Sequence, residues 1–407
     1  MNTRISKHPW KLVPLLLIAT TLPLFAAEAE SLRDSLKRGK LLLNLRFRYE
    51  HVDQTGLDKE AHAATLRTRL GFETASYRGF QFLVDFENIT VTGPTRYNDT
   101  TGNEPTRPVV ADPEDTELNR AQLTYRWAKG QRLVVGRQRI IHDQARFVGN
   151  VGWRQNEQTF DAVTFAHDKL GPFKVTASYL DNVNRIFGEH HPSNGDLRLQ
   201  GYLAHAVTKP WAGASLSLFF HGLDPVHRPA AAHRNLGFRV KGAWPPKSAK
   251  GACTYRLSWV DQQDFADGDP AIDVAYLDLG LGYKRGPFSI TAGWEVLEGN
   301  GEYGFSTPLA TLHAFNGWAD VFLNTPVFGL EDRSLAAAYK DRGWKVIVVA
   351  HQFEAESEDV DYGDEIDLLI AKSVTKKLGV GLKAARYEAD LWASDRTKVW
   401  LFADWRF

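Results

Sequence analysis

The chain has 407 residues with 49 Lys or Arg and 49 Asp or Glu, so its formal net charge is zero. This balance argues against a strongly basic nucleic-acid-binding protein, and we expect no nucleic-acid partner. The single cysteine, Cys253, excludes an intramolecular disulfide and a cysteine-based metal site. No linker or shift in composition divides the chain, so one continuous domain is expected.

Residues 1–29 have the layout of a secretory signal peptide. Basic residues precede an apolar run from Leu12 to Phe25, and Ala27-Glu28-Ala29 fits a cleavage site after Ala29. The apolar run is short for a membrane anchor, which is the alternative. Removing residues 1–29 takes away three basic residues and one acidic residue, leaving 46 basic and 48 acidic. We therefore expect an exported chain whose mature part is 30–407.

From residue 41 onward, apolar and polar side chains alternate in segments of about ten residues, the pattern of strands that cross a membrane as a closed barrel. In Leu41–Glu50, the odd positions are all apolar or aromatic, and Asn44, Arg46, Arg48 and Glu50 occupy even positions. Any single segment of this kind also fits a soluble sandwich. Eighteen strands are predicted, near 41–50, 64–74, 79–88, 117–127, 131–138, 158–167, 172–181, 197–207, 213–221, 233–242, 251–260, 273–284, 288–297, 332–340, 344–353, 364–373, 379–388 and 396–407.

The predicted connections alternate between short turns and longer loops, as outer-membrane barrels require. A nineteenth strand within 313–323 would break this alternation, so we assign that segment to a loop. The last strand alternates up to Trp405 and Phe407, and it resembles the closing strand of bacterial outer-membrane barrels, where it also acts as the assembly signal. We expect an all-β, transmembrane antiparallel barrel of about 18 strands in the outer membrane of a Gram-negative bacterium. Its expected partners are outer-membrane lipid, lipopolysaccharide and the barrel-assembly machinery.

Barrels of this size leave an aqueous channel, so function should depend on inward side chains and on loops that enter the opening. Alternation places more Lys and Arg than Asp and Glu on the inward faces, which favours anionic solutes. The alternative is that these charges pair with neighbouring carboxylates. The candidate pore-lining residues from this pattern are Arg46, Arg48, Arg67, Arg69, Arg126, Arg198 and Arg239.

The outer loop 298–331 is much longer than a hairpin connection needs, and it contains Trp318 and Asp320. Apolar groups in a wholly exposed loop would be costly to leave in water, so we expect the loop to fold into the pore and narrow it. The alternative is a loop that packs above the rim. Both Trp318 and Asp320 are therefore candidate substrate or pore residues.

Catalytic and metal-binding signatures are missing from the sequence. No nucleophile elbow, phosphate-binding loop or zinc-protease motif occurs, and the paired histidines at His190-His191 have no convergent Asp, Glu or Cys. We expect no enzymatic activity, no cofactor and no metal.

Three stretches resemble the alginate-export family of outer-membrane porins. They are Gly136-Arg137-Gln138 with the following 149–156, then Leu312 to Asp320, then Asp361 to Leu368. The resemblance implies an eighteen-stranded barrel with a positively lined route for an anionic uronate polymer such as alginate, and it adds Arg137 and Arg154 as candidate pore residues. The expected function is passive diffusion of anionic solutes. A substrate-specific uptake porin for small carboxylates or neutral oligosaccharides, and a non-conducting structural or adhesive barrel, remain as alternatives.

Overall fold

The structure is a computed structural model that describes residues 28–245 and 251–407. Residues 1–27 of the predicted signal peptide, 1–29, lie outside the described residues. The described chain forms one 18-stranded antiparallel sheet in which each strand pairs with its neighbours in sequence. The predicted fold class and strand number are confirmed.

One short α-helix, two 3₁₀ turns and eighteen strands make up the described chain. Their bounds are α1 Leu32–Lys37, β1 Lys40–Gln54, β2 Ala61–Glu73, β3 Phe80–Val91, β4 Asp115–Ala128, β5 Gln131–Gln138, β6 Thr159–Leu170, β7 Phe173–Asn184, β8 Asp196–Thr208, β9 Ala214–Pro225, η1 Pro229–Ala231, β10 His233–Trp244, β11 Ala252–Asp264, β12 Asp273–Arg285, β13 Phe288–Leu297, η2 Leu312–Ala314, β14 Leu330–Asp341, β15 Trp344–Glu354, β16 Asp361–Ser373, β17 Leu378–Ala389 and β18 Arg396–Arg406.

The first and last strands close the sheet into a barrel. Tyr49 of β1 lies opposite Ala64 of β2 on one side and opposite Leu401 of β18 on the other. Closure leaves no unpaired strand edge to aggregate. Each predicted strand overlaps an observed one, although several are longer, and 313–323 contains only η2.

The connections alternate in length as the sequence indicates. The β14–β15 turn has only two residues, Arg342 with φ of 45° and Gly343 with φ of 81°. Positive φ at both positions is the type I′ geometry whose twist matches an antiparallel hairpin. The β13–β14 connection, in contrast, spans residues 298–329. The barrel therefore has a short-turn end and a long-loop end.

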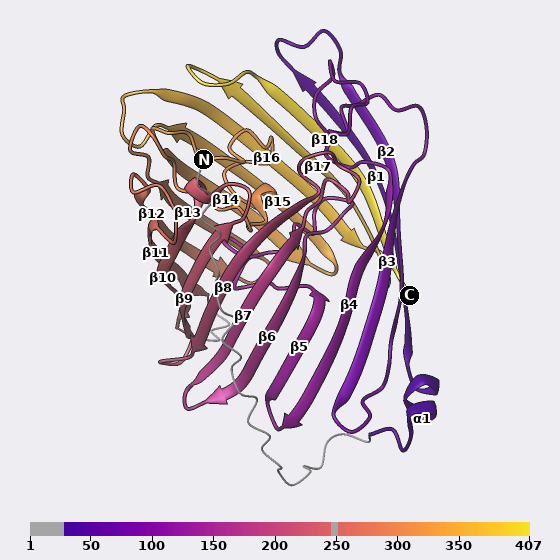
Figure 1. Cartoon of the computed structure of the whole chain (residues 1–407). Helices are drawn as coiled ribbons and strands as arrows, with labels where there is room; N and C mark the ends of the chain where they lie inside the picture. The colour runs from indigo at the N-terminus through magenta and orange to yellow at the C-terminus, as the bar shows by residue number, and fades with distance from the viewer. Residues whose placement is uncertain (1–27, 246–250) are drawn as a thin grey trace, which may run out of the picture.

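The two ends are marked by different elements (Figure 1). Helix α1 lies at the short-turn end, and the β1–β2 hairpin reaches out at the opposite end. The helix is capped by Ser31, whose Oγ accepts a hydrogen bond of 3.1 Å from the Asp34 backbone nitrogen. In the described part of the chain, no helix is long and apolar enough to cross a membrane.

The outer wall exposes large apolar side chains, as expected where the surrounding medium is lipid. They occur on strands all around the barrel, including Leu41, Phe47, Leu70, Phe80, Phe86, Val163, Tyr202, Leu236, Leu281, Phe288, Leu335, Ile366 and Leu401. On β1, for example, the exposed Phe47 lies between the buried Arg46 and Arg48.

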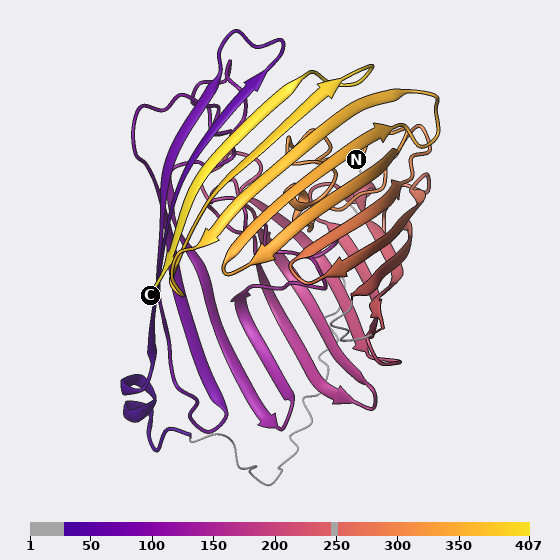
Figure 2. The same cartoon turned by 180° about the vertical axis from the view of Figure 1, so that it is seen from behind.

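The buried core lies inside the barrel. Figures 1 and 2, viewed from opposite sides, both show loop segments within the ring of strands. Phe305 and Phe322 of the β13–β14 loop pack in one cluster with Tyr276, Tyr387 and Trp400 of the wall. A second cluster joins loop residues Ile140, Val148 and Leu309 to inward leucines of β7, β8 and β9. The loops thus bury apolar surface that would otherwise face the lumen.

Candidate functional site

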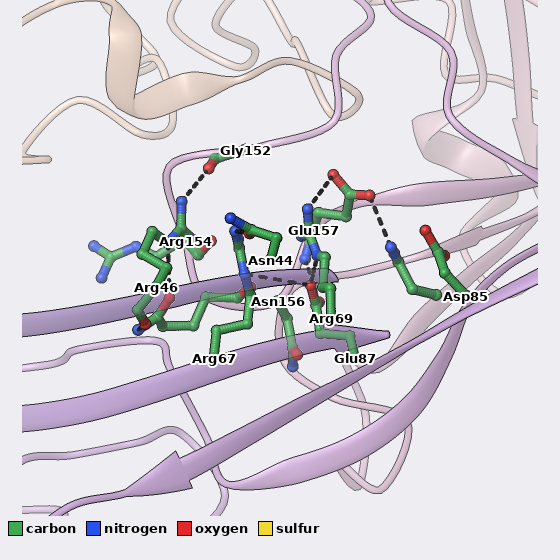
Figure 3. A network of polar contacts seen from close by, with 12 residues as sticks. Asn44, Arg46, Arg67, Arg69, Asp85, Glu87, Gly152, Arg154, Asn156 and Glu157 are labelled. Atoms are coloured by element: carbon green, nitrogen blue, oxygen red, sulfur yellow. Dashed lines mark hydrogen bonds and ion pairs between the residues drawn. The ribbon is translucent and has the colours of Figure 1, made fainter. Parts of the chain in front are cut away.

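The β5–β6 loop, residues 139–158, crosses the lumen and binds the inner face of β1 (Figure 3). Arg46 donates from Nη1 to the Gly152 carbonyl at 2.8 Å and from Nε to Gln155 Oε1 at 2.9 Å. Arg48 contacts the Trp153 carbonyl and pairs with Asp112 of the β3–β4 loop. These strand arginines therefore hold loop backbone against the wall.

Glu157 is the centre of the neighbouring part of this network (Figure 3). Its carboxylate lies 3.4 Å from Arg69 of β2 and also pairs with Arg139, and it accepts a 2.8 Å hydrogen bond from Asn150. Burial acts to raise the pKa of Glu157, but the guanidinium groups of Arg69 and Arg139 outweigh it and lower the pKa to about 2. The carboxylate is thus charged at neutral pH and fixes the end of the loop.

The β13–β14 loop is held inside the barrel by Asp320. One carboxylate oxygen lies 2.6 Å from Lys398 Nζ of β18 and 3.0 Å from Arg154 Nη2 of the β5–β6 loop. The other lies 2.6 Å from His313 Nδ1. Burial opposes ionisation, yet His313, Lys398 and Arg154 together hold the pKa of Asp320 well below its ordinary value. Asp320 therefore joins the two loops to each other and to the wall.

An aromatic and cationic stack lies beside this carboxylate. Lys383 Nζ of β17 is 2.6 Å from His313 Nε2 and 3.7 Å from the centre of the Trp318 ring. The His313 ring stacks on Trp153 with centroids 4.9 Å apart. Burial lowers the pKa of His313 to about 3, against the opposing effect of Asp320. The neutral ring then donates from Nδ1 to Asp320 and accepts from Lys383 at Nε2.

Of the predicted pore arginines, Arg48, Arg67 and Arg69 are thus held in ion pairs, and Arg46 hydrogen-bonds to Gln155 and to loop carbonyls, so none of the four faces open solvent. Arg46, Arg48 and Arg67 are 8%, 1% and 3% exposed. Arg69 pairs with both Glu87 and Glu157. All four arginines lie on the inward face that alternation predicts. The ion pairs agree with the alternative interpretation, in which inward charges pair with neighbouring carboxylates. Arg154 lies in the same network through Glu50, at 3.1 Å.

Arg137 does not point into the lumen. In the sheet register it lies beside Ala121 and Asp161, on the face shared by Val135 and Val163, and it pairs with Asp161 at 2.9 Å. Val135 and Val163 are exposed on the outer wall. The neighbouring Gln138 takes the buried inner position instead.

Arg198 was also assigned to the wrong face. It is exposed, and it alternates with Leu197 and Leu199, which pack in the inner cluster against loop residues Ile140 and Val148. The prediction assumed that leucines face lipid on every strand. On β8 the inward leucines are covered by the loops, so the polar side chain faces outward.

The remaining predicted arginines lie on the inner wall near the short-turn end. Arg126 donates to Gln81 at 2.9 Å. Arg239 lines a hollow of about 650 Å³ together with Lys209, Lys241 and Arg256. Among the described residues that line this hollow, none is acidic.

A second hollow, of about 380 Å³, opens at the same end of the barrel. Lys345, Lys376, Lys377 and Arg406 line it with Arg46 and Arg48, and Asp404 is the acidic residue among the described residues that line it. Lys376 and Lys377 belong to the β16–β17 turn. We call these two spaces the basic hollows.

Several residues of the site were not predicted as site residues. Alternation along the last two strands would have placed Lys383 and Lys398 inside, because both alternate with lipid-facing residues. No local pattern links Lys376 and Lys377 in a turn, or Asp112 in a loop, to the lumen. The predicted assembly residues Trp405 and Phe407 lie at the end of β18, where their rings stack at 4.9 Å and Phe407 N bonds to Leu43 O at 3.0 Å.

Comparison by sequence gives no match: no family model and no curated protein matches the chain. Comparison by structure gives several solved porins. OccK8 (OprE) of Pseudomonas aeruginosa has a TM-score of 0.70 at 14% identity, covering 92% of this chain and 99% of that chain. OccAB4 of Acinetobacter baumannii has a TM-score of 0.71 at 12% identity, covering 91% and 98%. OpdO of Pseudomonas aeruginosa has a TM-score of 0.69 at 14% identity, covering 92% and 98%.

These similar structures are Occ and Opd outer-membrane porins, not alginate exporters. The resemblance to the alginate-export family is therefore unsupported beyond the general porin class. The closed barrel and its apolar outer wall are consistent with the cell outer membrane. The chain has the fold of an outer-membrane porin.

Proposed function

We propose that the chain is an outer-membrane channel for the uptake of small anionic solutes such as carboxylates, and not an exporter of a uronate polymer. One observation carries this proposal: two anchored loops narrow the lumen, and the basic hollows lie beyond them at the short-turn end. Short turns face the periplasm in barrels of this type. An anion that passes the loops would meet Lys345, Lys376 and Lys377 on one side and Lys241 and Arg256 on the other.

The loop packing argues against a polymer. Two apolar clusters and the Asp320 and Glu157 networks fill space that a chain of sugar units would need. Moving these loops aside would expose buried apolar groups and break several buried ion pairs. Solved structures with a similar fold are substrate-specific porins, which also favours a small solute over a polymer.

The basic hollows suit small carboxylates better than neutral sugars. Lysine and arginine attract anions at close range, and guanidinium groups bind carboxylate with two parallel hydrogen bonds. Arg239 supplies such a group in one hollow, whereas Arg256 and Arg406 are paired with Asp278 at 2.7 Å and with Asp404 at 3.0 Å. A neutral oligosaccharide gains nothing from this excess of positive charge.

Reversal potentials and single-channel currents in planar bilayers test the proposal. We expect a weakly anion-selective channel that a small uronate monomer blocks in a concentration-dependent way, whereas a uronate polymer has no effect. Changing Lys376 and Lys377 to Gln should shift selectivity toward cations. The matched control is Arg198→Gln, which removes a positive charge from the outer wall and should leave selectivity unchanged.

Three results would contradict the proposal. They are a cation-selective wild-type channel at neutral pH, equal responses of the lysine and control variants, and a folded barrel with no conductance. The last result would favour a structural or adhesive barrel.

A further inference from the structure

A cluster of two histidines and one glutamate lies on the outer wall, at the long-loop end of the β1–β2 hairpin. His51 belongs to β1, His62 to β2, and Glu60 to the loop between them. His51 Nε2 lies 3.1 Å from Glu60 Oε2, and His62 Nε2 lies 3.4 Å from the same oxygen. The hairpin therefore brings three potential ligand atoms together, all within 4.8 Å of one another.

We propose that His51, Glu60 and His62 form a surface binding site for a divalent transition-metal ion of the Zn²⁺ type. This inference goes beyond the proposed channel function, because the cluster faces away from the lumen. The outward side of β1 at this point is the side of Phe47 and Tyr49, which alternates with the inward Arg48 and Glu50.

The two His–Glu spacings match tetrahedral coordination. With metal–ligand bonds of about 2.0–2.1 Å, two ligands on a tetrahedral ion are about 3.4 Å apart. The His–Glu separations of 3.1 and 3.4 Å are close to that value. An ion held by these three groups would keep a fourth position open to water, and the side chains are 25%, 53% and 37% exposed for His51, Glu60 and His62.

A neighbouring hydroxyl orients one of the ligands. Tyr49 Oη lies 2.8 Å from His62 Nδ1. When Nε2 carries the metal, Nδ1 keeps its proton and donates it to the Tyr49 oxygen, which is the outer contact that metal-binding histidines usually have. The ring of His51 stacks on His62 with centroids 4.9 Å apart and an angle of 21°, and the Nε2 atoms of both rings contact the same Glu60 oxygen.

The charge of Glu60 is available for a cation. Among the described residues, the ion-pair partners found for its carboxylate are the two histidines, while Arg107 binds its backbone carbonyl instead. Two imidazoles and one carboxylate favour Zn²⁺, Ni²⁺ or Cu²⁺ over Mg²⁺ and Ca²⁺, which prefer all-oxygen sites. The donor set thus selects the metal class.

Zinc binding to the full-length protein in detergent, prepared without an oligohistidine tag, tests the proposal. We expect isothermal titration at neutral pH to show one Zn²⁺ per chain. Glu60→Gln, His51→Ala and His62→Ala should each weaken binding by at least tenfold, and Tyr49→Phe by about tenfold. The matched control is His227→Ala, an exposed loop histidine outside the cluster, which should bind as the wild type does.

Cobalt substitution gives a second readout that a purely structural role would not change. A Co²⁺ complex of the wild type should show the visible absorption of a low-coordinate N,O site, and Glu60→Gln should lose it. Heat-modifiable migration of each variant on a gel confirms that the barrel is assembled. The proposal is overturned by the absence of zinc binding in the wild type, or by unchanged affinity in an assembled Glu60→Gln variant.

Discussion

Replacing Asp320 with asparagine removes the charge that joins the two lumen loops to the wall. The wild-type carboxylate contacts Lys398 at 2.6 Å, Arg154 at 3.0 Å and His313 at 2.6 Å, and it is 8% exposed. The amide keeps the size of the side chain and can still hydrogen-bond to His313. It leaves two buried cations with less negative charge around them.

The free energy lost from loop anchoring depends on the partners that Arg154 and Lys398 keep. Removing one member of a buried ion pair typically costs about 3–5 kcal/mol. Arg154 and Lys398 both retain Glu50, at 3.1 and 3.6 Å, so the lower end, about 3 kcal/mol, applies. Since 1.4 kcal/mol corresponds to a factor of ten, the population with a released β13–β14 loop should rise about 100-fold.

Single-channel recording measures that population directly. Brief high-conductance events should become about 100-fold more frequent in Asp320→Asn, and a protease should cut the loop faster. Asp267→Asn is the control, because Asp267 is exposed in the β11–β12 loop. Indistinguishable recordings from the two variants would refute the view that Asp320 anchors the loops.

Three other changes should affect the loops or the assembly of the barrel. A released loop restores the ordinary pKa of about 6.5 to His313, whereas the anchored ring has a pKa of about 3, so release takes up a proton and becomes easier as pH falls from 6.5 toward 3. At pH 5 protonation of His313 favours loop release by about 2 kcal/mol. The variant His313→Gln should therefore lose most of the rise in high-conductance events at low pH. Shortening the segment between Gly301 and Gly329 should raise conductance in an assembled barrel, and unchanged conductance would place the constriction elsewhere. Deleting Phe407, whose nitrogen bonds to Leu43, should impair assembly more than a loop substitution does, and normal levels of heat-modifiable protein would contradict that expectation.

The barrel and its strand order were predictable because membrane insertion imposes a local rule. Each strand must alternate between a lipid-facing and an inward side chain, and every backbone group must find a partner in a closed sheet. The sequence 41–50 shows this rule without any tertiary information, and burial along β1 alternates from Arg46 to Asp53. The alternating lengths of the connections then set the number of strands at eighteen.

The interior was less predictable, because its environment depends on segments distant in sequence. Arg198 was placed inside on the assumption that leucine faces lipid, yet Leu199 is buried against Val148 of a loop some fifty residues earlier. Arg137 belongs to a motif that suggested a pore role, but the strand register turns it toward the outer wall.

The sequence by itself determined the barrel, its strands and the inward orientation of Arg46, Arg48, Arg67 and Arg69. Only the tertiary structure decided that Arg48 and Arg69 pair with loop carboxylates and that Arg46 binds loop backbone, because such contacts depend on distances that strand alternation does not encode. The same holds for His51 and His62, which are eleven residues apart in the chain and become neighbours only when the β1–β2 hairpin closes and sets them directly opposite each other.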